Sequence, residues 1–303
     1  MGFGCGALMQ APSRRERMAV LAGALDSGIT HFDTARMYGL GRAEAELGAF
    51  LRTVERDTVT IATKFGIDAG GAARRLGRFQ GPARALLKRA PALRRIVKRQ
   101  QAPSAIGRVY DAGIAARSLD ASLAALGVDY VDILFVHAPR PQDTVAADEL
   151  REFFESARRQ GKIRAWGVSQ DEGLESDFAG VFAPEGISQF RSDLLNPSPR
   201  PADLAFGVLD GPYRKLAGAL HADPGMARRW RETMQTDPLA PGVLPKLILA
   251  SSAAAMACSA ILYSTTRPHR VAEAASAISS PPDAETVTRF LALVAEFRHG
   301  GVA

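Results

Sequence analysis

The sequence predicts an α/β protein whose eight parallel strands close into a (β/α)8 barrel, with a single domain over residues 1–303. Three observations predict this fold. Buried strands alternate with amphipathic helices, which implies parallel pairing with right-handed crossovers. Eight such units fit in 303 residues, and polar side chains gather where strands end. A doubly wound sheet is the alternative, but no strand is followed by a Gly-x-Gly-x-x-Gly turn that opens a helix.

The strands are predicted from short apolar or β-branched segments. The segment TVTIATKF, for example, is typical of a strand that is covered on both faces. With a first strand at the N-terminus, the predicted set is 2–6, 29–35, 58–65, 130–137, 163–169, 187–190, 204–209 and 259–264.

The helices are predicted from apolar residues at helical spacing. The first begins at Ser13, whose hydroxyl can cap the helix while Glu16 reaches back, and it ends at Gly28. The same spacing predicts further helices over 47–54, 119–126, 146–159, 244–258, 267–278 and 284–297. We expect variable loops after Asn196 and over residues 221–240.

Positive charge is concentrated in one segment. The formal net charge is +6, yet residues 69–108, after the third strand, hold eleven of the 38 basic residues and none of the 32 acidic ones. The rest of the barrel is therefore slightly acidic, and residues 69–108 form a basic insert. Three roles are open: a solvated lid, recognition of an anionic substrate, or binding to nucleic acid or anionic lipid. Phe79 is the only aromatic residue of the insert, which leaves little for base stacking.

Cysteine content and hydropathy exclude several classes of protein. Cys5 and Cys258 are too few for a disulfide framework or a four-thiolate zinc site, so we expect no metal and a reducing, cytoplasmic location. The N-terminus has neither a basic region nor a long apolar stretch, which argues against a secretory signal. The uncharged run over residues 247–263 is short for a membrane span and rich in alanine and serine.

Four titratable side chains stand at or just beyond three predicted strand ends: Asp33, Tyr38, Lys64 and His137. In a barrel these ends meet at one mouth. Taken singly, Asp33 could cap a turn, Tyr38 could pack at a turn, and His137 could be a satisfied core histidine. Lys64 is harder to explain in this way, because an unpaired buried lysine is costly.

Taken together, the four side chains suit one kind of chemistry. A lysine ammonium lowers the pKa of a neighbouring tyrosine, and an aspartate offsets the burial cost of the lysine. A histidine can donate a hydrogen bond to a carbonyl oxygen. With these neighbours, the tyrosine can protonate the oxyanion that forms as a hydride reaches a carbonyl carbon.

The chain resembles the aldo-keto reductase superfamily in three segments, GITHFDTARMYGLGRAEAELGAFL, TIATKFG and LGVDYVDILFVHAP, and the resemblance extends over most of its length. This resemblance implies a (β/α)8 barrel and an NADP-dependent oxidoreductase that reduces an aldehyde or ketone to an alcohol, or the reverse. NADPH is the implied cofactor, with NADH as the alternative. Tyr38 would be the general acid, Lys64 and Asp33 would tune it, and His137 would orient the carbonyl.

The resemblance also implies a set of cofactor contacts. These are Ser169, Gln170 and Gln189 at the carboxamide, Phe206 as the stacking face, and Ser264, Arg270 and Glu273 at the adenosine phosphate and adenine. Gln170 and Ser264 stand where the family has Asn and Lys. NADPH is favoured over NADH because Arg267, His269 and Arg270 offer cations for the 2′-phosphate.

Two other functions stay open. One is a non-catalytic, cofactor-binding redox sensor or scaffold on the same fold. The other is a binder of anionic surfaces through the basic insert. For the leading function the expected partner is a small carbonyl or alcohol substrate, with an anionic one as a special case. Nucleic acid and membranes are not expected partners.

Overall fold

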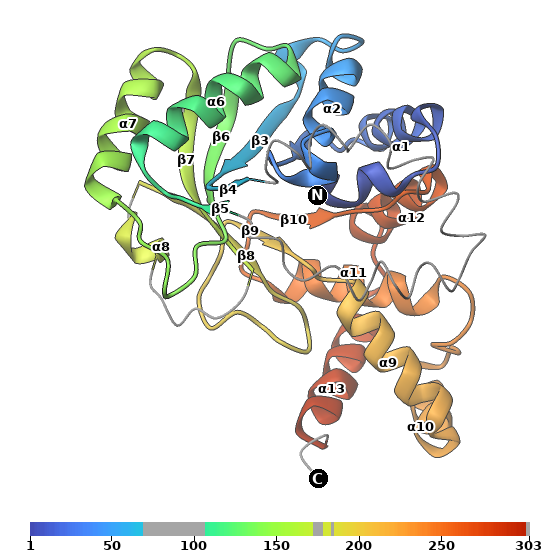
Figure 1. Cartoon of the computed structure of the whole chain (residues 1–303). Coiled ribbons are helices and arrows are strands. Elements are labelled where there is room, and N and C mark those ends of the chain that lie inside the picture. The colour runs from blue at the N-terminus through green and yellow to red at the C-terminus, as the bar shows by residue number, and fades with distance from the viewer. Residues whose placement is uncertain (69–106, 172–177, 183–184, 301–303) are drawn as a thin grey trace, which may run out of the picture.

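The structure is a computed structural model that describes residues 1–68, 107–171, 178–182 and 185–300. Eight parallel strands close into a barrel in the order β1-β10-β9-β8-β7-β6-β3-β2 (Figure 1). The strands are β1 (Gly2–Gly4), β2 (His31–Asp33), β3 (Thr60–Phe65), β6 (Val131–His137), β7 (Ile163–Gln170), β8 (Ile187–Arg191), β9 (Leu204–Phe206) and β10 (Ala260–Tyr263). The predicted (β/α)8 fold is confirmed. The basic insert lies outside the described residues, apart from its last two.

The described helices cover the outside of the barrel and extend beyond it on one side. They are α1 (Arg14–Asp26), α2 (Ala43–Leu51), α6 (Ala112–Leu126), α7 (Ala147–Arg159), α8 (Phe178–Val181), α9 (Asp210–Ala222), α10 (Pro224–Met234), α11 (Val243–Ala255), α12 (Pro268–Ser279) and α13 (Ala284–Gly300). Figure 1 shows α9, α10 and α13 projecting from the side of the barrel where α11 lies. Within the described part of the chain, no helix has both the length and the apolar character needed to cross a membrane.

Local sequence signals explain where several helices begin and end. The predicted capping box at α1 is present: Ser13 Oγ accepts from the Glu16 amide at 3.2 Å, and the Glu16 carboxylate accepts from the Ser13 amide at 2.9 Å. The helix α6 ends at Gly127, which has a φ of +68°. A left-handed residue at this point favours glycine, because a side chain there would be strained.

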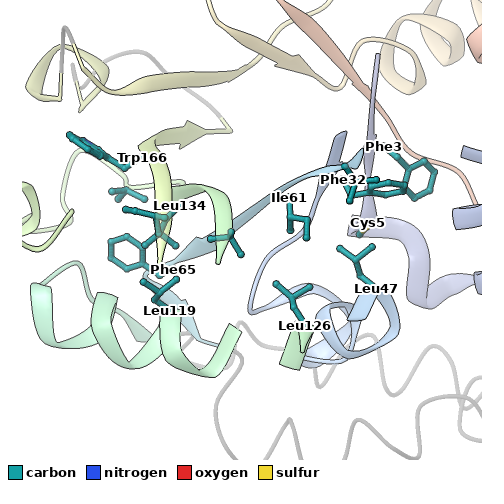
Figure 2. Close-up of a cluster of buried hydrophobic side chains, with 14 of the residues drawn as sticks. Phe3, Cys5, Phe32, Leu47, Ile61, Phe65, Leu119, Leu126, Leu134 and Trp166 are labelled. Carbon is teal, nitrogen blue, oxygen red and sulfur yellow. The ribbon is translucent and has the colours of Figure 1, made fainter. Parts of the chain in front are cut away.

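The main core lies between the outer faces of the strands and the helices that cover them. Figure 2 shows Phe32 and Ile61 of neighbouring strands facing Leu47 of α2 and Leu126 of α6. The four side chains are fully buried. Removing this much apolar surface from water drives the strand–helix layers together.

The inside of the barrel is filled by the alternate residues of the strands. Ala62 and Phe135 pack with Leu204 in the interior, and Ile133 packs beside them. Ala62 and Phe135 stand two residues before Lys64 and His137, so strand alternation points Lys64 and His137 inward as well. Lys64 and His137 therefore lie directly above the apolar side chains that fill the barrel interior.

One connection agrees with the sequence prediction and another differs from it. Residues 192–203, between β8 and β9, contain no helix, because Pro197, Pro199 and Pro201 cannot sustain one. The predicted variable loop over 221–240 is wrong for most of its length, since α10 occupies Pro224–Met234. The Asp223 carboxylate caps this helix and a proline follows at its first position, a start signal that the sequence does contain.

A small antiparallel sheet joins the two ends of the basic insert. Strand β4 (Ile67–Asp68) follows β3 directly and pairs with β5 (Gly107–Arg108). The chain then enters α6 after Tyr110. The segment that leaves the insert is therefore anchored beside the end of the strand that carries Lys64.

Candidate active site

A cavity of about 1150 Å³ opens at the carboxyl ends of the barrel strands. Its wall includes Asp33, Tyr38 and His137, which come from the ends of β2 and β6 and the turn after β2. Helices α9, α11 and α12 form the other side. This is the end of a (β/α)8 barrel at which active sites are found.

A buried ion pair lies behind the cavity wall. The Lys64 ammonium donates to Asp33 Oδ1 and, at 3.0 Å, to the carbonyl oxygen of Thr34. Gln189 Nε2 donates to the other carboxylate oxygen of Asp33 at 2.8 Å. Lys64 is 1% exposed and Asp33 is 3% exposed. Each charge therefore has its partner inside the barrel, as a buried charge requires.

Tyr38 and His137 meet in front of this pair. Their ring centroids are 5.8 Å apart and the rings are nearly perpendicular. The Lys64 ammonium lies 5.2 Å from the centroid of the Tyr38 ring and hydrogen-bonds the Tyr38 side chain. The structure thus brings together all four side chains that the sequence placed at strand ends.

The net electrostatic effect on Tyr38 differs from the sequence argument. Burial raises the pKa of Tyr38 above its ordinary value, and this outweighs the opposing effect of the Lys64 charge. The Asp33 carboxylate raises the Tyr38 pKa further. The Lys64 charge does lower the Tyr38 pKa, as the sequence reasoning expects, but the net shift is upward because burial outweighs it, and sequence reasoning had no measure of burial. A phenol with this shift keeps its proton at neutral pH.

His137 and Lys64 have fixed charge states at neutral pH. Burial lowers the pKa of His137 well below its usual value, and the positive charges of Lys64 and Arg108 add to this effect. Burial also lowers the pKa of Lys64, but Asp33 and Tyr38 more than offset it, so the net shift is upward. His137 is therefore neutral, with one ring N–H to donate, while Lys64 stays charged.

The proposed cofactor residues divide into two groups. Six of them line the cavity: Ser169, Gln189, Phe206, Ser264, Arg270 and Glu273. Ser169 Oγ donates to Gln189 Oε1 at 2.5 Å, so Gln189 links Ser169 to Asp33. Gln170 is buried but does not line the cavity, because alternation along β7 turns it away from the side that Ser169 faces.

Several residues at the mouth were missed by the sequence reasoning. Asp171 lines the cavity and pairs with Arg191 at 3.0 Å, and the Arg191 guanidinium lies 5.2 Å from the centroid of the Phe206 ring. Alternation from Gln189 could have found Arg191, which stands two residues later on the same strand. Lys246 of α11 also lines the cavity, and the sequence carries no signal for its position.

Comparisons with known proteins agree with this geometry. The family model of the Aldo/keto reductase family matches residues 1–176. A D-threo-aldose 1-dehydrogenase from Pseudomonas sp is 33% identical over 222 residues, which is 71% of this chain and 57% of that protein. An NADP(+) aldo-keto reductase from Schizosaccharomyces pombe is 29% identical over 56% of this chain and 42% of its own length. The chain thus spans about half the length of these curated relatives.

Solved structures show the same fold. The glycerol dehydrogenase structure from Gluconobacter oxydans superposes with a TM-score of 0.67 at 17% identity, covering 97% of this chain and 91% of that one. The residues matched by the family model include all four titratable residues of the site, Asp33, Tyr38, Lys64 and His137. The chain belongs to the aldo/keto reductase family.

Proposed function

We propose that the protein is an NAD(P)H-dependent oxidoreductase that reduces an aldehyde or ketone to an alcohol, or catalyses the reverse reaction. One observation carries the proposal: Tyr38 and His137 converge on one cavity, with the Lys64–Asp33 pair directly behind Tyr38. A protonated phenol, a neutral imidazole and a charged ammonium are the states that carbonyl reduction requires.

The residues around the cavity fit a nicotinamide dinucleotide. The hydrogen-bonded pair of Ser169 and Gln189 offers donors and acceptors for a carboxamide, and Phe206 offers an aromatic face. At the other side, His269 and Arg270 lie in the first turn of α12 and line the cavity. Free amides at a helix N-terminus favour a phosphate there. Such a cofactor, when reduced, supplies a hydride to the carbonyl carbon.

The side chains of this protein manage the proton and the developing charge. His137 donates its ring N–H to the carbonyl oxygen and so orients the substrate. Tyr38 donates its phenolic proton to the same oxygen as negative charge develops on it. The Lys64 ammonium then stabilises the phenolate that remains, while Asp33 holds Lys64 in place. General acid catalysis of this kind contributes roughly 10²–10⁴-fold to a rate.

We further propose that NADPH is preferred over NADH. Arg270 and His269 line the cavity where the 2′-phosphate would lie, whereas Arg267, the third cation considered in the sequence, does not. The guanidinium geometry of arginine suits a phosphate. The name of the Schizosaccharomyces pombe relative, which includes NADP(+), supports the same preference.

A panel of carbonyl compounds and alcohols tests the function. Purified protein is assayed with NADPH and with NADH in both directions, against neutral and anionic aldehydes, ketones and aldoses. We expect nucleotide oxidation matched by alcohol formation, with a higher kcat/KM for NADPH. Tight nucleotide binding without turnover of any compound would favour a non-catalytic sensor instead.

Two arginine variants test the cofactor preference. Arg270→Ala should raise the Kd for NADPH far more than the Kd for NADH, because only the former carries the 2′-phosphate. Arg267→Ala is the matched control, since this neighbouring arginine does not line the cavity. Equal losses in both variants would count against the assignment of Arg270.

A further inference from the structure

The segment that follows the basic insert passes over the ends of two barrel strands. The amide of Val109 donates to the carbonyl oxygen of Gly66 at 3.0 Å, just beyond β3. The carbonyl oxygen of Tyr110 accepts from the amide of Ala146 at 3.1 Å, at the start of α7. Tyr110 is 1% exposed. Its backbone is therefore held on both sides, and its side chain is enclosed.

The Tyr110 hydroxyl contacts the backbone of the candidate catalytic histidine. It donates to the carbonyl oxygen of His137 at 2.8 Å and lies 3.4 Å from the carbonyl oxygen of Ala138. Arg108 adds a second donor, because its Nη1 donates to the carbonyl oxygen of Ala138 at 2.5 Å and to the Tyr110 hydroxyl at 3.3 Å. Two side chains thus hold two consecutive carbonyl groups.

The backbone at this point needs such support. Ala138 has a φ of +43°, in the left-handed region that alanine rarely adopts. A strained conformation persists only where its surroundings impose it. The Ala138 amide donates to the carbonyl oxygen of Ser169 at 2.6 Å, which fixes the other side of the same peptide. The carbonyl groups of His137 and Ala138 and the amide of Ala138 are thereby all hydrogen-bonded.

A glycine makes room for the Tyr110 ring at the end of β3. Gly66 has a φ of +101°, and a Cβ at this position would collide with the Tyr110 ring. The ring therefore packs against backbone only two residues after Lys64. One side chain touches the ends of β3 and β6, the strands that carry Lys64 and His137.

We propose that Tyr110 is a positioning residue that fixes the His137 carbonyl group, and through it the direction of the His137 imidazole toward Tyr38. Arg108 supports the same turn through the carbonyl group of Ala138. The inference rests on the proposed function, since it assigns His137 the role of orienting the substrate. Loss of the Tyr110 hydroxyl leaves the His137 carbonyl group without its buried donor, so the strained turn can relax and rotate the imidazole.

The test compares Tyr110, whose hydroxyl contacts the last residue of β6, with Tyr130, which stands just before the first residue of β6. Tyr110→Phe removes the hydroxyl that holds His137. Tyr130→Phe is the control, since its hydroxyl is also hydrogen-bonded, to Asp57 Oδ1 at 2.7 Å, but lies before β6 begins. We expect kcat/KM for the carbonyl substrate to fall about tenfold in Tyr110→Phe, with an unchanged Kd for NADPH. Tyr130→Phe should retain the wild-type value.

A second readout does not depend on turnover. The chain has five histidines, so ring signals of histidine-labelled protein can be assigned by NMR with a His137→Gln variant. The His137 ring signals should shift in Tyr110→Phe and stay in place in Tyr130→Phe. Should the wild type reduce no carbonyl compound, the proposed function fails while these signals still test the positioning.

A third variant covers the case in which Tyr110→Phe does not fold. Arg108→Gln removes a partly exposed donor and a positive charge that lowers the pKa of His137. The His137 ring signals should then shift, because the Ala138 carbonyl group loses its Arg108 donor and the turn after β6 can relax. Unchanged His137 signals in every folded variant, or equal activity losses in the Tyr110 and Tyr130 variants, would overturn the proposal.

Discussion

Lys64 shows at the residue scale how a costly feature points to function. An ammonium at the end of an apolar strand is expensive unless paired, and here Asp33 pairs with it while Gln189 satisfies the second carboxylate oxygen. Structural stability does not require such a pair, because apolar residues of similar volume serve as well or better. The pair is consistent with a role in supporting Tyr38.

The buried pair makes a prediction about stability. Lys64→Met leaves the Asp33 carboxylate buried without its counter-ion and should lower the free energy of unfolding by about 3–5 kcal/mol. The double variant Asp33→Asn/Lys64→Met should recover much of this loss. Both values can be measured by urea unfolding. A loss below about 1 kcal/mol for Lys64→Met would mean that the pair is solvated rather than buried.

His137 makes a prediction about pH. Its pKa in the folded protein lies well below the ordinary value of 6.5, so above pH 6.5 it is neutral in both states. Below pH 6.5 the unfolded chain takes up the proton first, and the free energy of unfolding falls by about 1.4 kcal/mol per pH unit for each such group. His31, whose pKa is also lowered, contributes in the same direction.

Two substitutions isolate the share of His137 in this slope. His137→Gln should reduce the pH dependence of the free energy of unfolding between pH 5 and about 6.5. His31→Gln should remove a separate part of the dependence, because the pKa of His31 is also lowered. A His137→Gln slope equal to that of the wild type would show that His137 titrates normally in the folded protein.

Sequence reasoning reached the four titratable residues but not what surrounds them. Asp33, Lys64 and His137 stand at ends of recognisable strands, so their convergence follows from the barrel. Tyr110 could not be found in this way. It follows a long insert, and its hydroxyl contacts a backbone carbonyl group, which no sequence pattern reveals. The net upward shift of the Tyr38 pKa was missed for a related reason: it depends on how deeply the phenol is buried, which outweighs the lowering by Lys64.

At the scale of elements, the strongest local signals predicted structure best. The capping box of α1 and the glycine stop of α6 appear as predicted. Helix α9 was missed, and α10 was taken for a loop although Asp223 and the following proline mark its start. These helices bury Trp230 and Leu216 against α11 and α13 rather than against the barrel. Their partner surface lies in later elements, which local periodicity does not reveal.

Two helical glycines give a matched test of element packing. A Cβ at Gly48 in α2 would meet the carbonyl oxygen of Leu126 at 2.5 Å, whereas a Cβ at Gly218 in α9 would meet nothing within 4 Å. Gly48→Ala should therefore destabilise the protein by about 1–3 kcal/mol, because α2 must shift from α6. Gly218→Ala should stabilise it by roughly 0.5–1 kcal/mol. Thermal and urea unfolding of both variants measure this difference, and similar effects would contradict the packing described.

At the scale of the whole molecule, closure of the barrel builds the site. Strand β1 pairs with both β10 and β2, so residues from the two ends of the chain border one cavity. The alternation of strands and helices was sufficient to predict this closure. The position of α9 and α11 along the cavity wall was not predictable, since it depends on how these helices pack with α10 and α13.

Cofactor binding should stabilise the whole fold. A ligand that binds only the folded state adds about 2.7 kcal/mol to the free energy of unfolding at a concentration of 100 times its Kd. NADPH should therefore raise the unfolding midpoint more than NADH at equal concentration, and Arg270→Ala should reduce the difference. An equal response to both nucleotides in the wild type would contradict the proposed preference.

The most direct test of the account removes one oxygen atom from the centre of the site. Tyr38→Phe keeps the ring beside His137 and Lys64 but has no proton to donate. We predict that the variant binds NADPH with the wild-type Kd while its kcat for the carbonyl substrate falls by roughly 10²–10⁴-fold. A Tyr38→Phe variant with wild-type kcat would contradict the assignment of Tyr38 as the general acid.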